Sequence, residues 1–299
     1  MSGRSVPAKA APLRSRGSTD RHDPAVGCNT APMSAFDEAT AVHRIGDGVF
    51  DWAVLDGWQQ GRGAWGGLVV GAIVRAVVAT EPDPSRLVRS ISAQLVAPAV
   101  VGAHRITVSP VRQGSAMSTW GIDVESEGMG AVARAVVITG GGRTTDTSNH
   151  HMWGTLTRPD APSAMDVPGL PSGPPFPVFA QHCDFRPITG IPMSGGPAET
   201  LGWSGYADAT PVTATSLLAL VDAWWPASLP LLSQMPRIAT VNFTASLLVD
   251  PSTVPIGEPL LHHSVVAGAH EGFTSEHRRL WTADGRLAVD NMQTVVVGS

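Results

Sequence analysis

The chain has 299 residues, of which 43% are hydrophobic and 15% charged, and its formal net charge at pH 7 is −5. This hydrophobic fraction excludes a mostly disordered chain, and the acidic balance argues against a surface that coats nucleic acid, so we expect no nucleic-acid partner. The length allows two units of about 100–150 residues, each with its own core. Two cysteines, Cys28 and Cys183, are too few for a disulfide framework and form no Cys-x-x-Cys motif, which indicates a reduced, cytoplasmic setting.

Residues 1–35 differ in composition from the rest of the chain. Basic residues such as Arg4 and Lys9 are interspersed there with Ser, Pro, Ala and Gly, and no apolar run typical of a signal peptide follows them. We therefore expect a disordered N-terminal tail. The longest apolar stretch, from Leu68 to Thr80, contains Arg75 and is too short to cross a bilayer, so we expect no membrane span.

The first folded unit is expected over residues 36–142. The turn Trp65-Gly66-Gly67 leads into the nearly all-apolar segment Leu68–Ala79, which predicts a helix that is buried on most sides and ended by Pro82 and Pro84. Four strand-like runs separated by turn residues follow, over residues 87–96, 104–112, 118–125 and 131–139. A central helix followed by a meander of antiparallel strands predicts a curved sheet wrapped around the helix, which is the hotdog arrangement.

A linker and a second unit follow. Residues 143–178 are rich in Gly, Thr, Pro and Ser, which predicts a linker that crosses the surface. Over residues 179–299 the same order of elements returns: a strand, a helix and four strands are predicted at residues 179–188, 213–225, 239–249, 260–267, 274–281 and 287–297.

The two units can be laid over each other without gaps at two places. The segment Leu87–Pro98 matches Thr240–Pro251, and Ala135–Gly140 matches Gln293–Gly298. The similarity is weak, but the order of the elements and the final strands agree. Two copies of one α+β unit predict a double hotdog, in which two fused units carry an antiparallel sheet wrapped around central helices.

The two copies differ at polar positions. Thr240 and Gln293 stand where the first copy has Leu87 and Ala135, and the second predicted helix carries Asp222 within an apolar set, whereas the first has no acid. One copy is apolar where the other is polar, which predicts a single asymmetric site in the C-terminal unit. A carboxylate, a hydroxyl and an amide can orient one water and accept its proton as it attacks a carbonyl. Asp222, Thr240 and Gln293 are therefore the candidate catalytic residues.

The turn Trp65-Gly66-Gly67 offers backbone N–H groups at the positive end of a helix dipole. Glycine lets a carbonyl approach the backbone closely, so Gly66 and Gly67 are candidate donors to a developing oxyanion. A tight entry into a buried helix explains the same residues equally well. The start of the second helix is an alternative position for these donors.

Other chemistries fit the sequence poorly. It contains no Gly-x-Ser-x-Gly elbow, no phosphate-binding Walker loop and no dinucleotide fingerprint after a strand. The adjacent pairs His150-His151 and His262-His263 would point to opposite faces of a strand, which disfavours a metal pocket. We expect no cofactor and no metal.

Five short motifs occur in order across both units: Gly61–Gly67, Leu95–Pro98, Val111–Ser115, Arg237–Thr240, and Asp284–Ala288 leading to Gln293. Their order and spacing, over roughly residues 45–299, resemble those of the acyl-CoA thioesterase II (TesB-like) group of double-hotdog proteins. The family's Asp, Thr and Gln, which hold the hydrolytic water, would fall on Asp222, Thr240 and Gln293. One departure is that Asn242-Phe243 stands where better-known members carry an Asp-His pair, which indicates a divergent branch.

The resemblance implies an acyl-CoA substrate, a role in lipid metabolism, and association into a homodimer or higher homo-oligomer. It also implies an apolar tunnel for the acyl chain, with the coenzyme A arm running along the surface toward cationic side chains. Ordinary core packing is the alternative for the candidate substrate-binding residues, which are Trp65, Trp225, Phe243 and Met292.

The sequence thus predicts an acyl-CoA thioester hydrolase that activates water with Asp, Thr and Gln. One alternative is a non-catalytic acyl-CoA-binding hotdog module, which the Asn242-Phe243 departure keeps open. A less favoured alternative is a hydratase of enoyl or 3-hydroxyacyl thioesters, because that chemistry needs an Asp and a His near a helix start and no suitably placed pair is present.

Overall fold

The computed structural model describes residues 1, 3, 33–143 and 156–298. All of its helices and strands belong to the compact unit Met33–Ser299. Most of the expected N-terminal tail and the pair His150-His151 lie outside the described residues.

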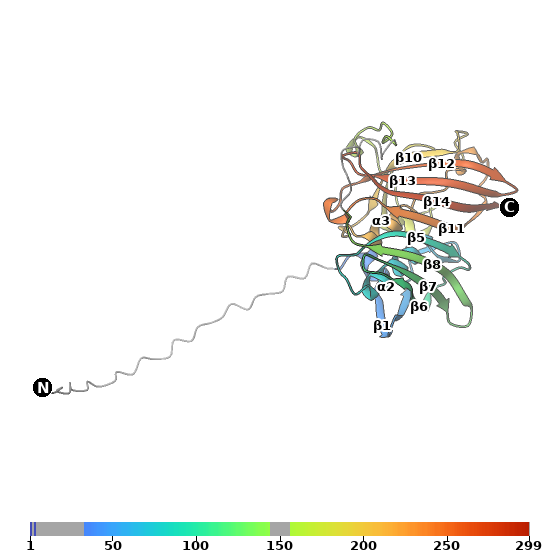
Figure 1. The fold of residues 1–299 in the computed structure, drawn as a ribbon. Helices are drawn as coiled ribbons and strands as arrows, with labels where there is room; N and C mark the ends of the chain where they lie inside the picture. Colours follow the sequence, from blue (N-terminus) through green and yellow to red (C-terminus); the bar gives the residue numbers. More distant parts are fainter. Residues whose placement is uncertain (2, 4–32, 144–155, 299) are drawn as a thin grey trace, which may run out of the picture. The chain divides into compact units, whose positions relative to one another are not determined.

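A single twelve-stranded antiparallel sheet dominates this unit (Figure 1). Its strand order is β1-β2-β6-β7-β8-β5-β11-β14-β13-β12-β10-β9. The strands of the N-terminal half are β1 (Val42–Gly46), β2 (Val49–Val54), β5 (Leu87–Leu95), β6 (Gly102–Gln113), β7 (Met117–Ser126) and β8 (Gly130–Gly140). Those of the C-terminal half are β9 (Cys183–Thr189), β10 (Glu199–Tyr206), β11 (Arg237–Leu247), β12 (Leu260–His270), β13 (Phe273–Trp281) and β14 (Leu287–Gly298). The short strands β3 (Gln59–Gln60) and β4 (Gly63–Ala64) form a separate ladder.

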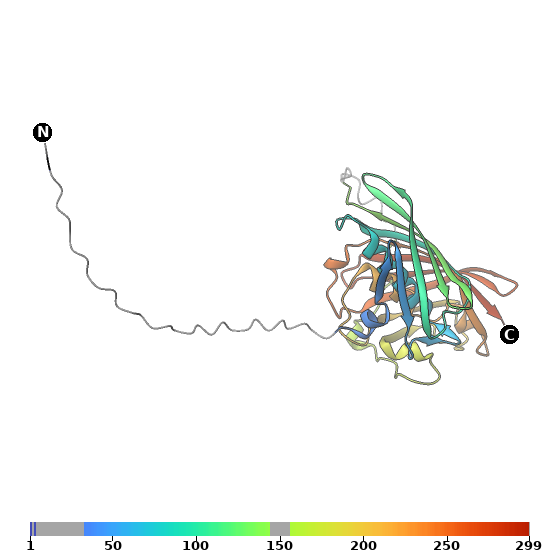
Figure 2. The ribbon, with the colours of Figure 1, turned by 90° about the horizontal axis from the view of Figure 1, so that it is seen from below.

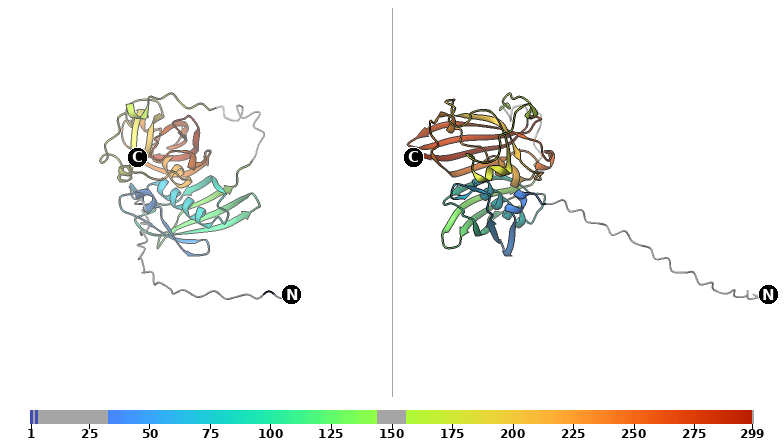
Figure 3. Two further views of the ribbon diagram at one scale, coloured as in Figure 1. Left: turned by 90° about the vertical axis from the view of Figure 1, so that its left-hand side faces the viewer. Right: turned by 180° about the vertical axis from the view of Figure 1, so that it is seen from behind.

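The two halves meet at the centre of the sheet, where β5 pairs with β11 and Ala93 lies opposite Phe243. On either side of this pair the order is the same: β5-β8-β7-β6 in one direction and β11-β14-β13-β12 in the other. Each half curls around its own helix (Figures 2 and 3). The predicted double hotdog is confirmed.

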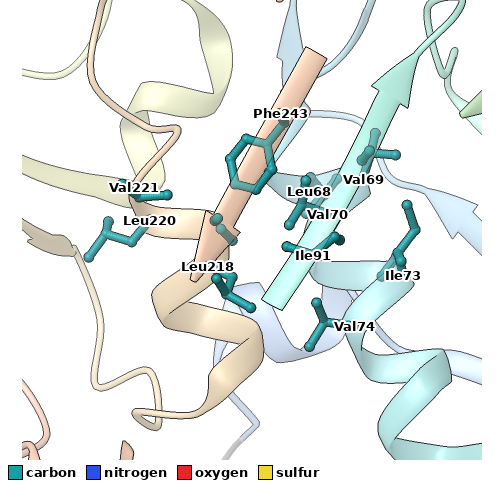
Figure 4. Packing of buried hydrophobic residues seen from close by; sticks show 14 of the residues in the cluster. Leu68, Val69, Val70, Ile73, Val74, Ile91, Leu218, Leu220, Val221 and Phe243 are labelled. Carbon is teal, nitrogen blue, oxygen red and sulfur yellow. The ribbon is translucent and has the colours of Figure 1, made fainter. Parts of the chain in front are cut away.

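Helices α2 (Gly66–Thr80) and α3 (Ala214–Leu220) pack against each other and against the sheet. Ile91 of β5 and Phe243 of β11 are buried with the apolar side chains of both helices (Figure 4). A short helix, α1 (Ala35–Ala39), precedes the sheet, with Ser34 as its N-cap. Among the described residues, no helix is long and apolar enough to cross a membrane.

The second central helix is shorter than predicted, since it ends at Leu220 and not at residue 225. Asp222 and Ala223 donate to carbonyls three residues back, at 3.0 Å each, so the chain tightens into turns after the helix. Pro226 disfavours the helical conformation for the residue before it. Asp222 therefore lies in a turn and not in a helix.

The sequence patterns also missed strands at the outer edge of each half. β10 carries Gly202 and Gly205, which weaken a strand pattern. A Cβ atom on Gly202 would lie 2.4 Å from the Trp224 ring, so glycine is required there for the backbone to approach that indole. The predicted strand at residues 179–188 begins only at Cys183, after a 3-10 helix over Val178–His182.

The described part of the expected linker, residues 156–178, packs on the outer face of the C-terminal half. Val167 is buried there with Trp203, Leu261 and Trp281. The Trp203 indole N–H also donates to the Pro162 carbonyl at 2.9 Å. This segment thus closes a second, smaller core.

Strand registers correct one detail of the internal repeat. Matching the final strands lays Val137 on Val295. Val137 lies opposite Ile91, and Val295 lies opposite Thr240, so the first-half counterpart of Thr240 is Ile91 and not Leu87. The contrast between the copies persists, because Ile91 is apolar and 1% exposed.

Two adjacent valines on α2 test the buried face of this helix. Val77 is 0% exposed and Val78 is 55% exposed. Val77→Ala leaves a cavity and should lower the free energy of unfolding by about 2 kcal/mol. Val78→Ala, the matched control, should change it by less than about 0.5 kcal/mol. Urea unfolding midpoints measure both, and equal effects would contradict the packing described.

Candidate active site

Asp222, Thr240 and Gln293 come together in the C-terminal half. The Gln293 amide Nε2 donates to Asp222 Oδ1 at 2.7 Å, and Thr240 Oγ1 donates to Gln293 Oε1 at 3.1 Å. Asp222 is 7% exposed and Gln293 1% exposed, whereas Thr240 is half-buried. The three side chains form one chain of hydrogen bonds that ends on a buried carboxyl group.

A β-bulge brings Thr240 into this chain. Phe243 lies opposite Gln293 and points to the inner face, so strict alternation would turn Thr240 to the outer face. The register of β11 and β14 shifts between Thr240 and Asn242, which inserts one extra residue. Thr240 and Phe243 consequently share the inner face, and the hydroxyl reaches Gln293.

The N-terminal half contributes the start of α2 to the same site. The backbone N–H of Gly67 faces the Asp222 carboxyl group and lowers its pKa, and a Cβ atom on Gly66 would lie 2.8 Å from Asp222 Oδ2. The Trp65 indole N–H donates to the Asp222 main-chain carbonyl at 3.1 Å. Gly67 itself could not carry a Cβ, which would lie 2.2 Å from the Trp65 ring. The positive end of one half's helix thus faces the carboxylate of the other half.

Burial raises the pKa of Asp222 above its ordinary value of 3.8. The nearby Arg278 charge, the Gln293 amide and the Gly67 N–H favour the ionised form and oppose this rise, while the charge of Glu276 adds to it. The carboxyl group is therefore placed where its proton affinity exceeds that of a solvated aspartate, as suits a proton acceptor.

Arg278 and Glu276 are two site residues that the sequence patterns missed. Both lie on the inner face of β13, where Arg278 is 1% and Glu276 0% exposed. The Arg278 guanidinium Nη1 lies 3.7 Å from Asp222 Oδ1. The available signal was the spacing of two residues on a strand, which puts both charges on one face.

The candidate substrate-binding residues have different surroundings. Trp65 is fully buried and stacks on Phe179, with ring centroids 4.9 Å apart. Phe243 is 0% exposed, between the helices and the central strands (Figure 4). Trp225 is half-buried and donates to the Gly190 carbonyl at 2.9 Å. Whether they line an acyl tunnel stays a prediction.

Met292 requires a correction. It precedes Gln293 on β14 and is 45% exposed. Successive residues of a strand point to opposite faces, so its side chain lies on the outer face, away from Asp222. An inner tunnel wall at this position is therefore wrong.

The histidine pair on β12 diverges as expected. His262 is 0% exposed and stacks on Trp224, with ring centroids 5.0 Å apart, whereas His263 bonds Glu199 at 2.8 Å. Within the described ranges, no group of three or more His, Cys, Asp or Glu side chains is arranged to hold a metal ion.

Comparisons with known proteins place the chain in a family. The acyl-CoA thioesterase N-terminal domain matches residues 54–140, and the acyl-CoA thioesterase C-terminal domain matches residues 158–297. The chain belongs to the acyl-CoA thioesterase family. This membership supports a thioesterase activity in general. Among curated proteins, none matches the chain.

Solved structures share the fold of this acyl-CoA thioesterase family member over most of its length. A hot dog fold protein of unknown function from Alicyclobacillus acidocaldarius is 25% identical, with a TM-score of 0.80, and the match covers 90% of this chain and 99% of the other. A Thermobifida fusca protein described provisionally as a thioesterase II is 21% identical, with a TM-score of 0.77 and coverage of 90% and 99%. An acyl-CoA thioesterase II from Mycobacterium marinum is 17% identical, with a TM-score of 0.71 and coverage of 88% and 98%.

The raised pKa of Asp222 makes stability depend on pH. The folded protein binds the Asp222 proton more tightly than the unfolded chain, so the resulting penalty is absent below the ordinary pKa of 3.8. It grows as the pH rises from that value through the higher folded-state pKa. Relative to Asp222→Asn, the wild type should therefore lose stability as the pH rises from the ordinary value of 3.8 until it has passed the raised folded-state pKa. The measurement is the Tm of both proteins across this range, and a constant difference would contradict the assignment.

Proposed function

We propose that this protein hydrolyses fatty acyl-CoA thioesters with a water molecule activated by Asp222 and oriented by Thr240 and Gln293. The observation that carries the proposal is the Asp222 carboxyl group, held by Gln293 from one half and facing the start of α2 from the other. A thioester carbonyl is activated enough for oriented water and a carboxylate to suffice.

In the proposed reaction the Asp222 carboxylate accepts a proton from water while the water oxygen attacks the thioester carbon. Gln293 directs its amide N–H at Asp222 Oδ1, and Thr240 fixes the orientation of that amide by donating to its oxygen. The negative charge develops on the former carbonyl oxygen. When the tetrahedral intermediate collapses, the carbon–sulfur bond breaks and the coenzyme A thiolate leaves, taking up the proton that Asp222 accepted from water.

Gly66 and Gly67 are the proposed donors to the developing oxyanion. Backbone N–H groups in the first turn of a helix have no partner within the helix and lie at its positive end. The Gly67 N–H faces the Asp222 carboxyl group in the present arrangement, so it would turn to the substrate oxygen during the reaction. A Cβ atom on Gly66 would lie 2.8 Å from Asp222 Oδ2, so the absence of a side chain at Gly66 lets groups in the site approach the backbone closely.

The contacts of Asp222 support the alternative functions, a hydratase or a binding module, less well than they support hydrolysis. In the described structure, the groups that face the Asp222 carboxyl group are the Gln293 amide, the Gly67 backbone N–H and the Arg278 guanidinium group. None is the histidine that a hydratase of this fold requires. An acyl-CoA-binding module without hydrolysis is distinguished by experiment, because it would bind substrate without releasing thiol. We further propose a cytoplasmic setting, a role in lipid metabolism and a homodimer or higher homo-oligomer, as the resemblance implies.

Replacing the proposed base should stop hydrolysis. Asp222→Asn and Asp222→Ala remove the proton acceptor and should lower kcat by about 10²–10⁴-fold. The measurement is release of free thiol from an acyl-CoA series of increasing chain length. Asp290→Asn is the matched control, since Asp290 lies on β14 with its carboxyl group bonded to Arg279 at 3.0 Å. Undiminished hydrolysis by both Asp222 variants would refute the mechanism, and tight binding without hydrolysis by the wild type would favour the binding module.

The hydroxyl of Thr240 offers a second test. Thr240→Val removes the donor to Gln293 Oε1 and should lower kcat by about 5–10-fold, the usual worth of one hydrogen bond. Thr244→Val on the same strand is the control, because Thr244 bonds Ser92 at 3.0 Å and not the site. Equal rates for the two variants would remove Thr240 from the mechanism.

A further inference from the structure

The buried Arg278 side chain contacts several oxygen atoms at and around Asp222. Its Nη1 donates to the main-chain carbonyl of Trp224 at 3.0 Å and lies 3.5 Å from that of Asp222. The same nitrogen is 3.7 Å from Asp222 Oδ1. The guanidinium group therefore contacts both the turn that carries Asp222 and the carboxyl group itself.

Glu276 fixes the other side of this guanidinium group. Its Oε1 accepts from Arg278 Nε at 2.9 Å. Removing charges from water is costly unless each finds partners, so a 1% exposed Arg278 and a 0% exposed Glu276 constrain each other's position. Arg278 is thereby held on β13 in the orientation that meets the turn after α3.

This charged pair occurs only in the half that holds Asp222. Matching the final strands lays Ala133 and Ala135 on Asn291 and Gln293. The strand neighbours of Ala133 and Ala135 are Val124 and Ile122, whereas those of Asn291 and Gln293 are Arg278 and Glu276. The fold itself therefore does not need the pair, since the other half fills the same two positions with buried apolar residues.

We propose that Arg278, tethered by Glu276, is a positioning residue that fixes the Asp222 turn and sets the charge state of the Asp222 carboxyl group. The proposal rests on the function proposed above. Its two parts are separable, because a lysine can supply the charge but not the planar guanidinium group that meets the two carbonyls and Glu276 together.

The groups that face Asp222 come from each element packed around it. Arg278 and Glu276 lie on β13, Gln293 on β14, and the Gly67 N–H at the start of α2. On β12, His262 stays neutral because burial and the Arg278 charge hold its pKa well below the ordinary value. Arg278 and Glu276 are thus the charges that act on the Asp222 carboxyl group, and they act in opposite directions.

The test compares three variants with a matched control. Arg278→Met should raise the midpoint of the acid limb of the kcat/KM profile by about one pH unit, and Glu276→Gln should lower it. Arg278→Lys should keep the wild-type midpoint but lower kcat. Arg279→Met is the control, because Arg279 is the next residue on β13 and pairs with Asp290 at 3.0 Å. It should change neither quantity.

A second readout measures the Asp222 carboxyl group without activity. The carbon-13 shift of its carboxyl carbon, in protein labelled at aspartate and assigned with Asp222→Asn, gives its titration midpoint in each variant. The expected shifts are the same: upward in Arg278→Met and downward in Glu276→Gln. If the wild type hydrolyses no acyl-CoA, the proposed function fails while this titration still decides the role of Arg278.

If the Asp222 midpoint shifts in the same direction in Arg278→Met and Glu276→Gln, or does not shift, the proposal is overturned. A purely structural pair would lower the stability of both variants without opposite effects on the Asp222 midpoint. Thermal unfolding of each variant identifies any that do not fold. If Arg278→Met does not fold, Glu276→Gln and Arg278→Lys decide the question. An unchanged or raised titration midpoint of Asp222 in Glu276→Gln overturns the proposal. A raised midpoint in Arg278→Lys overturns it as well.

Discussion

The burial of the Asp222 carboxyl group is the constraint on which the rest of the site depends. A carboxylate removed from water is unstable unless donors replace its hydration. The protein supplies these from separate elements: Gln293 on β14, the Gly67 N–H of α2 and the charge of Arg278 on β13. None of these is a neighbour of Asp222 in sequence, so the donors meet the carboxyl group only in the folded chain, and the Gly67 N–H does so only when the two halves are assembled.

The duplication of the fold explains how such a site can be asymmetric. Both halves need a sheet that closes on a helix, and apolar residues such as Ile91, Ile122 and Ala135 satisfy this need in the first half. The second half replaces their counterparts with polar groups that contact one another. Because the halves are covalently joined but differ in sequence, one half can keep an apolar core while the other builds the polar site. The first half still takes part, through the backbone at the start of α2.

The pattern of residues predicted much of this. Apolar periodicity located both central helices and the strands from β5 to β8 and from β11 to β14, because burial on one face imposes its period on the sequence. Comparing the two copies selected Asp222, Thr240 and Gln293, which the fold brings into one hydrogen-bonded chain. The alternation of side chains along a strand also predicts that Met292, the residue before Gln293, points outward.

The sequence by itself determined the order of the central elements and the repeat, because these follow from local burial patterns, and the comparison of the two copies selected the polar trio. Tertiary structure alone decided that Asp222 lies in a turn, that a bulge turns Thr240 inward, and that Gly66 faces the carboxyl group. It also decided that Arg278 meets that turn. Registers, bulges and contacts between distant segments depend on how the halves pack, and no local period in the chain encodes that packing.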